Sequence, residues 1–231
     1  MTSVRPSETL RETISRLLPN GLGAKGDEEL DPEVYPTRDL HVLVACSGSV
    51  ASVKIPLIVN DLLQHDKVQV QVVATHASLH FFDREALEAA HGGQVKVWTD
   101  AEEWAGWSRI GDPILHIELR RWADLVVVAP CSANTLSKLV AGSCDDILTS
   151  LLRALPQHVP VTLYPAMNTH MYSHPLTSRH LDFVRDVLGY AVRGPIPKKL
   201  ACGDIGMGAM TEWSKIVQDV VDRYDLRRVR A

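Results

Sequence analysis

Short apolar runs alternate along this chain with stretches in which apolar residues recur every three or four positions. Residues 125–129 read Leu-Val-Val-Val-Ala, and a run without polar positions is typical of a strand buried on both faces of a parallel sheet. Further strands are expected at residues 41–46, 68–74, 94–98 and 161–164. Helices are expected at residues 55–63, 132–141, 144–155, 175–188 and 213–224. This alternation predicts an α/β fold with a doubly wound, mainly parallel sheet and helices on both faces, flavodoxin-like or Rossmann-like.

Polar residues gather where the predicted strands end. Pro130 is expected to stop its strand, and the polar stretch 132–135 then opens a helix that Gly142 closes. Such a helix start offers hydroxyls, an amide and backbone N–H groups, which suit a phosphate, although for this stretch alone ordinary N-capping is the favoured explanation. Polar clusters also follow the other strands, at 47–52, 75–78 and 165–168. Because parallel strands end at one edge of the sheet, these clusters predict a ligand site there.

The stretch 47–52 lacks the G-x-G-x-x-G pattern, so a mononucleotide fits it better than a dinucleotide. Four glycines and two prolines in 194–210 predict a mobile loop or flap, and Thr211 is expected to cap the last helix. Residues 99–113 are expected to form a surface loop. Residues 1–38 are expected to be a partly flexible N-terminal extension with a short helix near 9–18, and residues 39–231 to form a single cofactor-binding domain.

Composition narrows the possible partners. The chain has 24 Lys and Arg against 28 Asp and Glu, a net charge of −4, so we expect no nucleic-acid or anionic membrane partner. No apolar run approaches the roughly 20 residues of a membrane helix, and the first residues lack a signal peptide's apolar stretch. The expected location is the cytoplasm. The four cysteines show neither C-x-x-C pairs nor a zinc-ligand grouping, so no metal site is expected.

Six motifs, taken together and in order, resemble those of one family. They are GSVAS (48–52), THASLHF (75–81), HIELRRWAD (116–124), APCSANTLSKLVAG (129–142), PAMNTHMY (165–172) and ACGDIGMGAM (201–210). With them the chain resembles the phosphopantothenoylcysteine decarboxylase family, flavoproteins that remove a cysteine carboxyl group. The resemblance implies FMN-dependent conversion of 4'-phosphopantothenoylcysteine to 4'-phosphopantetheine in coenzyme A biosynthesis, through transient oxidation to a thioaldehyde, loss of CO2 and re-reduction. It also implies a homotrimer with the site at the subunit interface.

The resemblance assigns roles to particular residues. His116 corresponds to the catalytic histidine and Cys202 to the proton donor in the flap, while Asn168 corresponds to the residue that binds the substrate carboxylate. The other substrate-binding residues are Lys199, Leu200, Ala201, Met210 and Arg121. The implied FMN contacts are Gly48, Ser49, Val50, Thr75, His76, Ala77, Ser132, Ala133, Asn134, Thr135 and Ala166. These residue types suit the chemistry, because histidine exchanges protons near neutral pH and an asparagine amide donates two hydrogens without adding charge.

Several alternatives stand beside these roles. A lone histidine is more often a hydrogen-bonded core residue, and Arg121 pairs either with substrate phosphate or with a carboxylate such as Asp124. A halotolerance-type regulatory subunit that inhibits a protein phosphatase is the main rival function, but the short basic end RYDLRRVRA differs from the acidic tail of those regulators. The ACGD motif disfavours a peptidyl-cysteine decarboxylase. Tyr172 stands where the family has Trp.

Overall fold

Six strands pair into one parallel sheet in the computed structural model, which describes residues 9–18, 38–105, 107–199, 203 and 205–229. The strands are β1 (Leu40–Cys46), β2 (Val68–Ala74), β3 (Val97–Trp98), β4 (Leu125–Cys131), β5 (Val161–Pro165) and β6 (Ala191–Val192). Their order across the sheet is β3-β2-β1-β4-β5-β6, with every pair parallel. The chain therefore reverses its direction of winding between β1 and β4, the point at which doubly wound sheets bind ligands. The predicted fold class is confirmed.

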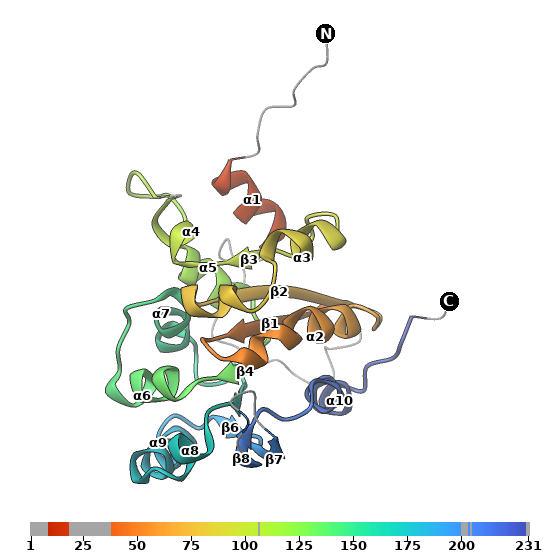
Figure 1. The fold of residues 1–231 in the computed structure, drawn as a ribbon. Coiled ribbons are helices and arrows are strands. Elements are labelled where there is room, and N and C mark those ends of the chain that lie inside the picture. Colours follow the sequence, from red (N-terminus) through yellow and green to blue (C-terminus); the bar gives the residue numbers. More distant parts are fainter. Residues whose placement is uncertain (1–8, 19–37, 106, 200–202, 204, 230–231) are drawn as a thin grey trace.

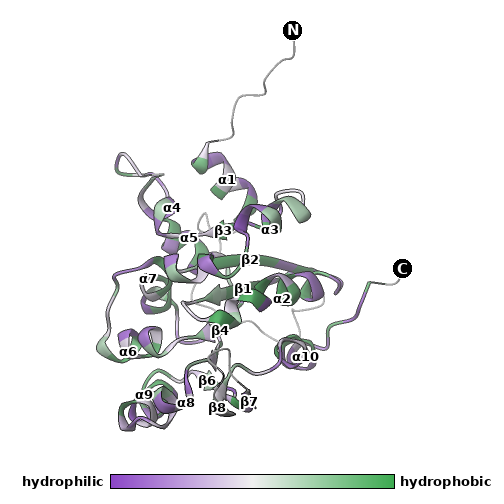
Figure 2. Cartoon of the chain, in the orientation of Figure 1, coloured by the Kyte–Doolittle hydropathy of each residue, from purple (hydrophilic) through white to green (hydrophobic). Residues whose placement is uncertain are grey.

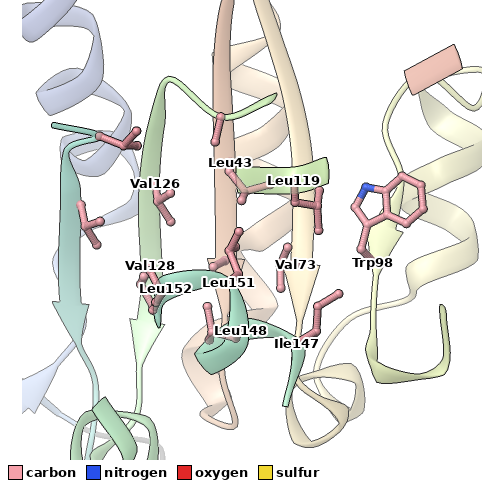
Figure 3. Packing of buried hydrophobic residues seen from close by; sticks show 14 of the residues in the cluster. Leu43, Val73, Trp98, Leu119, Val126, Val128, Ile147, Leu148, Leu151 and Leu152 are labelled. Carbon is pink, nitrogen blue, oxygen red and sulfur yellow. The ribbon is translucent and has the colours of Figure 1, made fainter. Parts of the chain in front are cut away.

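Helices cover both faces of the sheet (Figure 1). Alternate residues of β1 divide between two buried clusters, Leu43 facing one and Val44 the other. The first cluster includes residues of α5 (Leu115–Trp122), α6 (Ala133–Ala141), α7 (Ile147–Ala154) and α9 (Pro175–Asp186). The second includes residues of α2 (Ile55–Leu62), α3 (Arg84–Ala90) and α10 (Trp213–Tyr224). The central strands are accordingly among the most hydrophobic parts of the chain, as Figure 2 shows. Figure 3 shows α7 side chains such as Leu148 packed within the first cluster.

One short helix, α1 (Leu10–Leu17), comes from the N-terminal part of the chain and lies beyond β3 (Figure 1). Thr9 caps it through a reciprocal hydrogen-bond pair with Glu12, which satisfies donors at the helix start. Ile14 and Leu18 are fully buried in the first cluster. The helix expected near residues 9–18 is therefore present and contributes to the core. Within the described part of the chain, no helix is long and apolar enough to cross a membrane.

Two sequence-based expectations about the sheet and its edge are corrected. Pro130 does not stop β4, which continues to Cys131 through a register shift after Val128. Proline lacks a donor for the ladder, and this irregularity accommodates it. Residues 99–113 are not only a surface loop, because α4 occupies Asp100–Ala105.

The segment 194–210 also differs from the expected irregular loop. It contains two antiparallel strands, β7 (Ile196–Lys199) and β8 (Ile205–Ala209), which form a sheet of their own. Thr211 does not cap the last helix: α10 begins after Glu212, and the Thr211 hydroxyl donates instead to the Arg193 carbonyl at 3.4 Å. The remaining short elements are η2 (Val50–Lys54), η3 (His76–His80) and α8 (Thr169–Ser173).

Candidate functional site

A cavity of about 600 Å³ lies where β1, β4 and β5 end. Its wall combines the segments after these three strands with η2, β8 and the start of α10. The lining includes Gly48, Ser49, Val50, Ser132, Ala133, Asn134, Ala166, Met167, Asn168, Met210 and Trp213. Apolar and aromatic side chains with a few polar groups among them are typical of cavities that bind a planar organic ligand.

A hydrogen-bonded junction between the two central strands adjoins the cavity at Ser132. The backbone N–H and hydroxyl of buried Ser47 both donate to the Pro130 carbonyl, at 3.1 and 3.0 Å. The same hydroxyl accepts from the Ser132 N–H at 2.8 Å, and the Ser132 hydroxyl accepts from the Thr135 N–H at 3.2 Å. The start of α6 is therefore fixed against the end of β1. Because the first N–H groups of a helix have no partner within the helix, this start is suited to an anion.

The segments after β1 and β2 lie against each other beside this junction. A Cβ added at Gly48 would stand 2.7 Å from the Cβ of Ala77, so only glycine permits this approach. The Thr75 N–H donates to the Cys46 carbonyl at 3.1 Å. The Thr75 hydroxyl is buried and has no hydrogen-bond partner among the described residues. A buried, unpartnered hydroxyl at the end of a strand marks a place where a ligand atom fits.

The hairpin of β7 and β8 closes another side of the cavity. The Met167 N–H donates to the Gly208 carbonyl at 2.9 Å, which ties β8 to the segment after β5. Gly208 has a φ of 145°, and a Cβ there would come within 2.2 Å of the Met167 carbonyl oxygen. Lys198 on β7 lines the cavity, and its ammonium pairs with Glu212 at 2.6 Å. This wall of the cavity therefore depends on a close contact between β8 and the segment after β5, which only glycine at position 208 permits.

His116 lies on α5 and is not among the residues that line this cavity. Its Nδ1 is hydrogen-bonded to an oxygen of Glu103, which lies on α4. The His116 side chain is 20% exposed, whereas that of Glu103 is only 5% exposed. Sequence analysis did not single out Glu103, because the surrounding segment was expected to be a loop.

The predicted site residues fall into three groups. Those on the cavity are Gly48, Ser49, Val50, Ser132, Ala133, Asn134, Ala166, Asn168 and Met210. Those elsewhere in the described chain are Thr75, His76, Ala77, His116, Arg121 and Thr135. Leu200, Ala201 and Cys202 lie outside the described residues, as does the side chain of Lys199.

Several further residues singled out from the sequence also have partners within the chain. Arg121 donates to Glu118 at 2.9 Å, while Asp124 pairs instead with Arg38 at 2.8 Å. The Asn168 side-chain oxygen accepts from the His170 N–H at 2.8 Å and so caps α8. Tyr172 packs against the first buried cluster. The aromatic residue at position 172 therefore contributes to packing next to the cavity wall.

Sequence reasoning missed several lining residues, among them Phe81, Met171 and Lys198. Phe81 was within a recognised motif, but its motif gave no reason to choose it over its neighbours. Two cysteines at the ends of β1 and β4, Cys46 and Cys131, are fully buried. Burial raises the pKa of both Cys46 and Cys131 to about 12, so neither thiol is ionised near neutral pH.

Comparison with known proteins identifies the family of this chain. Residues 32–225 match the family described as Flavoprotein. A rice phosphopantothenoylcysteine decarboxylase is 48% identical over 182 residues, 79% of this chain and 79% of the relative. A fission yeast relative named probable thymidylate synthase is 47% identical over 189 residues, 81% of this chain, but the match spans only 30% of that protein.

Solved structures match with similar strength. The structure of a PPC decarboxylase mutant complexed with pantothenoylaminoethenethiol is 45% identical, with a TM-score of 0.75 over 81% of this chain and 100% of that one. The FMN binding protein AtHal3 is 46% identical, with a TM-score of 0.72 over 81% of this chain and 98% of that one. The family match covers most of the chain and the fold agrees along the same region. The chain belongs to the flavoprotein family.

Proposed function

We propose that this flavoprotein is a carboxy-lyase that converts 4'-phosphopantothenoylcysteine to 4'-phosphopantetheine, a step of coenzyme A biosynthesis, with FMN as its cofactor. The observation that carries the proposal is the cavity at the winding reversal, which gathers residues of the GSVAS, APCSAN and PAMN motifs and Met210 of the ACGD motif. Relatives named phosphopantothenoylcysteine decarboxylase, such as the rice protein, support the same reaction.

The residues present fit FMN. The apolar wall suits a flavin ring, and the start of α6 with Ser132 and Asn134 suits its phosphate. Behind the lining residue Gly48, the close approach to Ala77 gives a tight edge, and the buried Thr75 hydroxyl, which is outside the cavity lining, would be free to bond a ligand atom that reaches it. When bound, FMN supplies a hydride acceptor that later returns the hydride, so that the decarboxylation involves no net oxidation.

The chain's own residues would bind and orient the substrate and handle its protons. Asn168 borders the cavity, and an amide N–H there can hold the substrate carboxylate without a positive charge that would resist loss of CO2. His116 holds or accepts a proton at Nε2, the ring nitrogen that does not face Glu103. Cys202, assigned from its motif, protonates the carbon that has lost CO2. Lys199, Leu200, Ala201, Met210 and Arg121 complete the proposed substrate contacts.

The proposed assembly is a homotrimer in which His116 completes a neighbour's site. Two observations support it. His116 does not line the cavity of its own chain, and the segment before α5 exposes large apolar side chains. Trp104 is 66% exposed and Ile110 is 96% exposed, which is typical of a surface that contacts a partner.

The proposed domain boundaries are 1–38 for the extension and 39–231 for the FMN-binding domain. The proposed location is the cytoplasm. Its support is chemical: Cys46, Cys131 and Cys144 are free thiols, as is usual in reducing compartments.

The first experiment is spectroscopic and enzymatic. The purified protein is expected to be yellow, to release FMN on denaturation, and to convert phosphopantothenoylcysteine to phosphopantetheine with release of CO2. A colourless protein that binds no added FMN would contradict the cofactor assignment. A yellow protein that leaves the substrate unchanged would contradict the reaction.

A second experiment tests the shared site by mixing two inactive variants, His116→Asn and Asn168→Asp, after dissociation and reassembly. If one subunit supplies His116 and its neighbour supplies Asn168, about a quarter of the sites regain both residues at equal mixing. Each variant reassembled alone is the control. Activity that stays at the level of the separate variants would place both residues in one subunit's site.

A further inference from the structure

Among the described residues, Glu103 is the side chain hydrogen-bonded to the His116 ring, and the known motifs leave it without a role. The carboxylate comes from the last part of α4 and reaches the His116 ring on the first turn of α5. The two helices are thus linked through a side-chain pair at the position where the proposed chemistry needs a defined imidazole. We propose that Glu103 is a positioning residue that fixes the tautomer and orientation of His116, an inference that rests on the proposed function.

The direction of this hydrogen bond follows from the donor inventory. An ionised carboxylate only accepts, so His116 Nδ1 must carry the hydrogen that faces Glu103 Oε1. In the neutral ring Nε2 then holds the lone pair and is the atom able to accept a proton. Glu103 therefore decides which of the two ring nitrogens acts on the substrate.

The environment of Glu103 favours this role over that of a simple tether. The residue is 5% exposed, and its second oxygen is buried without a hydrogen-bond partner among the described residues. Burying a carboxylate with so few partners is costly, and an apolar or amide side chain would join two helices at a lower cost. The charge is explained if it stabilises the imidazolium that forms when Nε2 takes up a proton.

The preceding residue provides a contrast and a matched control. Glu102 lies on the same helix, but its carboxylate caps α4 through Thr99 and pairs with Arg84. The Glu102 carboxylate serves the structure of α4, and no hydrogen bond or ion pair among the described residues joins it to His116. Replacing either glutamate with glutamine removes one carboxylate from the same helix turn, so the two variants separate an effect on His116 from an effect on the helix.

The test compares Glu103→Gln with Glu102→Gln in the full FMN-loaded protein. Glutamine can turn its NH2 toward Nδ1, so the ring should switch to the tautomer protonated at Nε2. We expect kcat to fall at least about tenfold in Glu103→Gln with KM within about twofold, since the ring stays in place but presents the wrong atom. Glu102→Gln should keep kcat within about twofold while its melting temperature falls.

Nitrogen-15 spectra of labelled histidine read the tautomer directly, with the His116 signals assigned by their loss in His116→Asn. The wild-type protein should show His116 protonated at Nδ1 at a pH where the ring is neutral, and Glu103→Gln should show it protonated at Nε2. Wild-type His116 protonated at Nε2 would overturn the inference. So would an activity loss in Glu103→Gln that only follows lost flavin or lost stability, as in the control variant.

These spectra need no substrate, so they test the Glu103–His116 pair separately from the reaction. A wild-type protein with the Nδ1 tautomer but no decarboxylation would contradict the proposed function and still support the pair.

Discussion

The cavity at the strand ends and the α4–α5 segment that carries His116 are built in different ways. At the cavity, backbone groups and the buried Ser47 hydroxyl join the two central strands, and glycines allow loops to touch. On α4–α5, the buried side of α5 packs in the first cluster, and a side-chain pair between Glu103 and His116 joins the two helices beside exposed Trp104 and Trp107. The first arrangement is fixed by the sheet itself, whereas the second depends on individual side chains. Cofactor binding and proton handling should therefore respond to different substitutions.

The largest expected effect comes from His116→Asn. The variant removes the proton-handling group from α5 and leaves the cavity unchanged, so decarboxylation should fall by about 10²–10⁴-fold. FMN content, measured by absorbance after gel filtration, should match the wild-type protein. Near-normal CO2 release would show that His116 is only a hydrogen-bonded structural histidine. Loss of FMN together with activity would show that the cavity and the α4–α5 segment do not respond independently.

Gly208→Ala tests the cavity wall that β8 forms. A Cβ within 2.2 Å of the Met167 carbonyl oxygen must push β8 away from the segment that carries Asn168. We expect a stability loss of about 2–4 kcal/mol in denaturant unfolding, together with a rise in KM, because both strain and a displaced wall result. Gly189→Ala is a suitable control, since Gly189 also has positive φ, at 71°, but a Cβ there meets nothing within 4 Å. Equal losses in the two variants would show that backbone strain alone is responsible.

Asn134→Asp should act on the cofactor alone. Asn134 lies exposed in the first turn of α6 and lines the cavity, so an aspartate there places a negative charge near the proposed phosphate. FMN should bind about tenfold more weakly at low ionic strength, with a smaller effect at high salt. The His116 tautomer should not change. Stoichiometric flavin after gel filtration, with unaltered affinity in titration, would mean that the phosphate does not bind at this helix start.

Thiol alkylation tests whether the ends of β1 and β4 stay closed in the native protein. We expect Cys46 and Cys131 to remain unmodified there. Burial raises the pKa of Cys46 and Cys131 to about 12, so each stays protonated, closed off and unreactive at pH 8. Exposed Cys144 should be modified before Cys46 and Cys131, as peptide mapping can show, and unfolding in guanidinium should then make the two buried thiols reactive. Modification of Cys131 in the native protein would mean that the strand ends open more readily than the sheet hydrogen bonds suggest.

The difference between the regions also explains what could be predicted from sequence. Apolar runs located five of the six sheet strands, but not β6, which has only two residues, and Ser132 with Gly142 marked both ends of α6 as observed. Three of the first residues of α4 are acidic, so no apolar stripe marks it as a helix. The β7–β8 hairpin was missed because its glycines reflect contacts with Met167 and Thr169, which no local pattern reveals. Glu103 was missed for the same reason: its partner lies on another helix.

The Ser47 junction has a practical consequence for following the fold. Its hydroxyl holds together the ends of β1 and β4, which form the centre of the six-stranded sheet. A flavin bound beside that junction depends on strand ends and a helix start that keep their places only while the central strands stay paired. The rise of flavin fluorescence on heating should therefore coincide with the loss of far-ultraviolet ellipticity. The fluorescence of the released cofactor would then report unfolding of the sheet without an added dye.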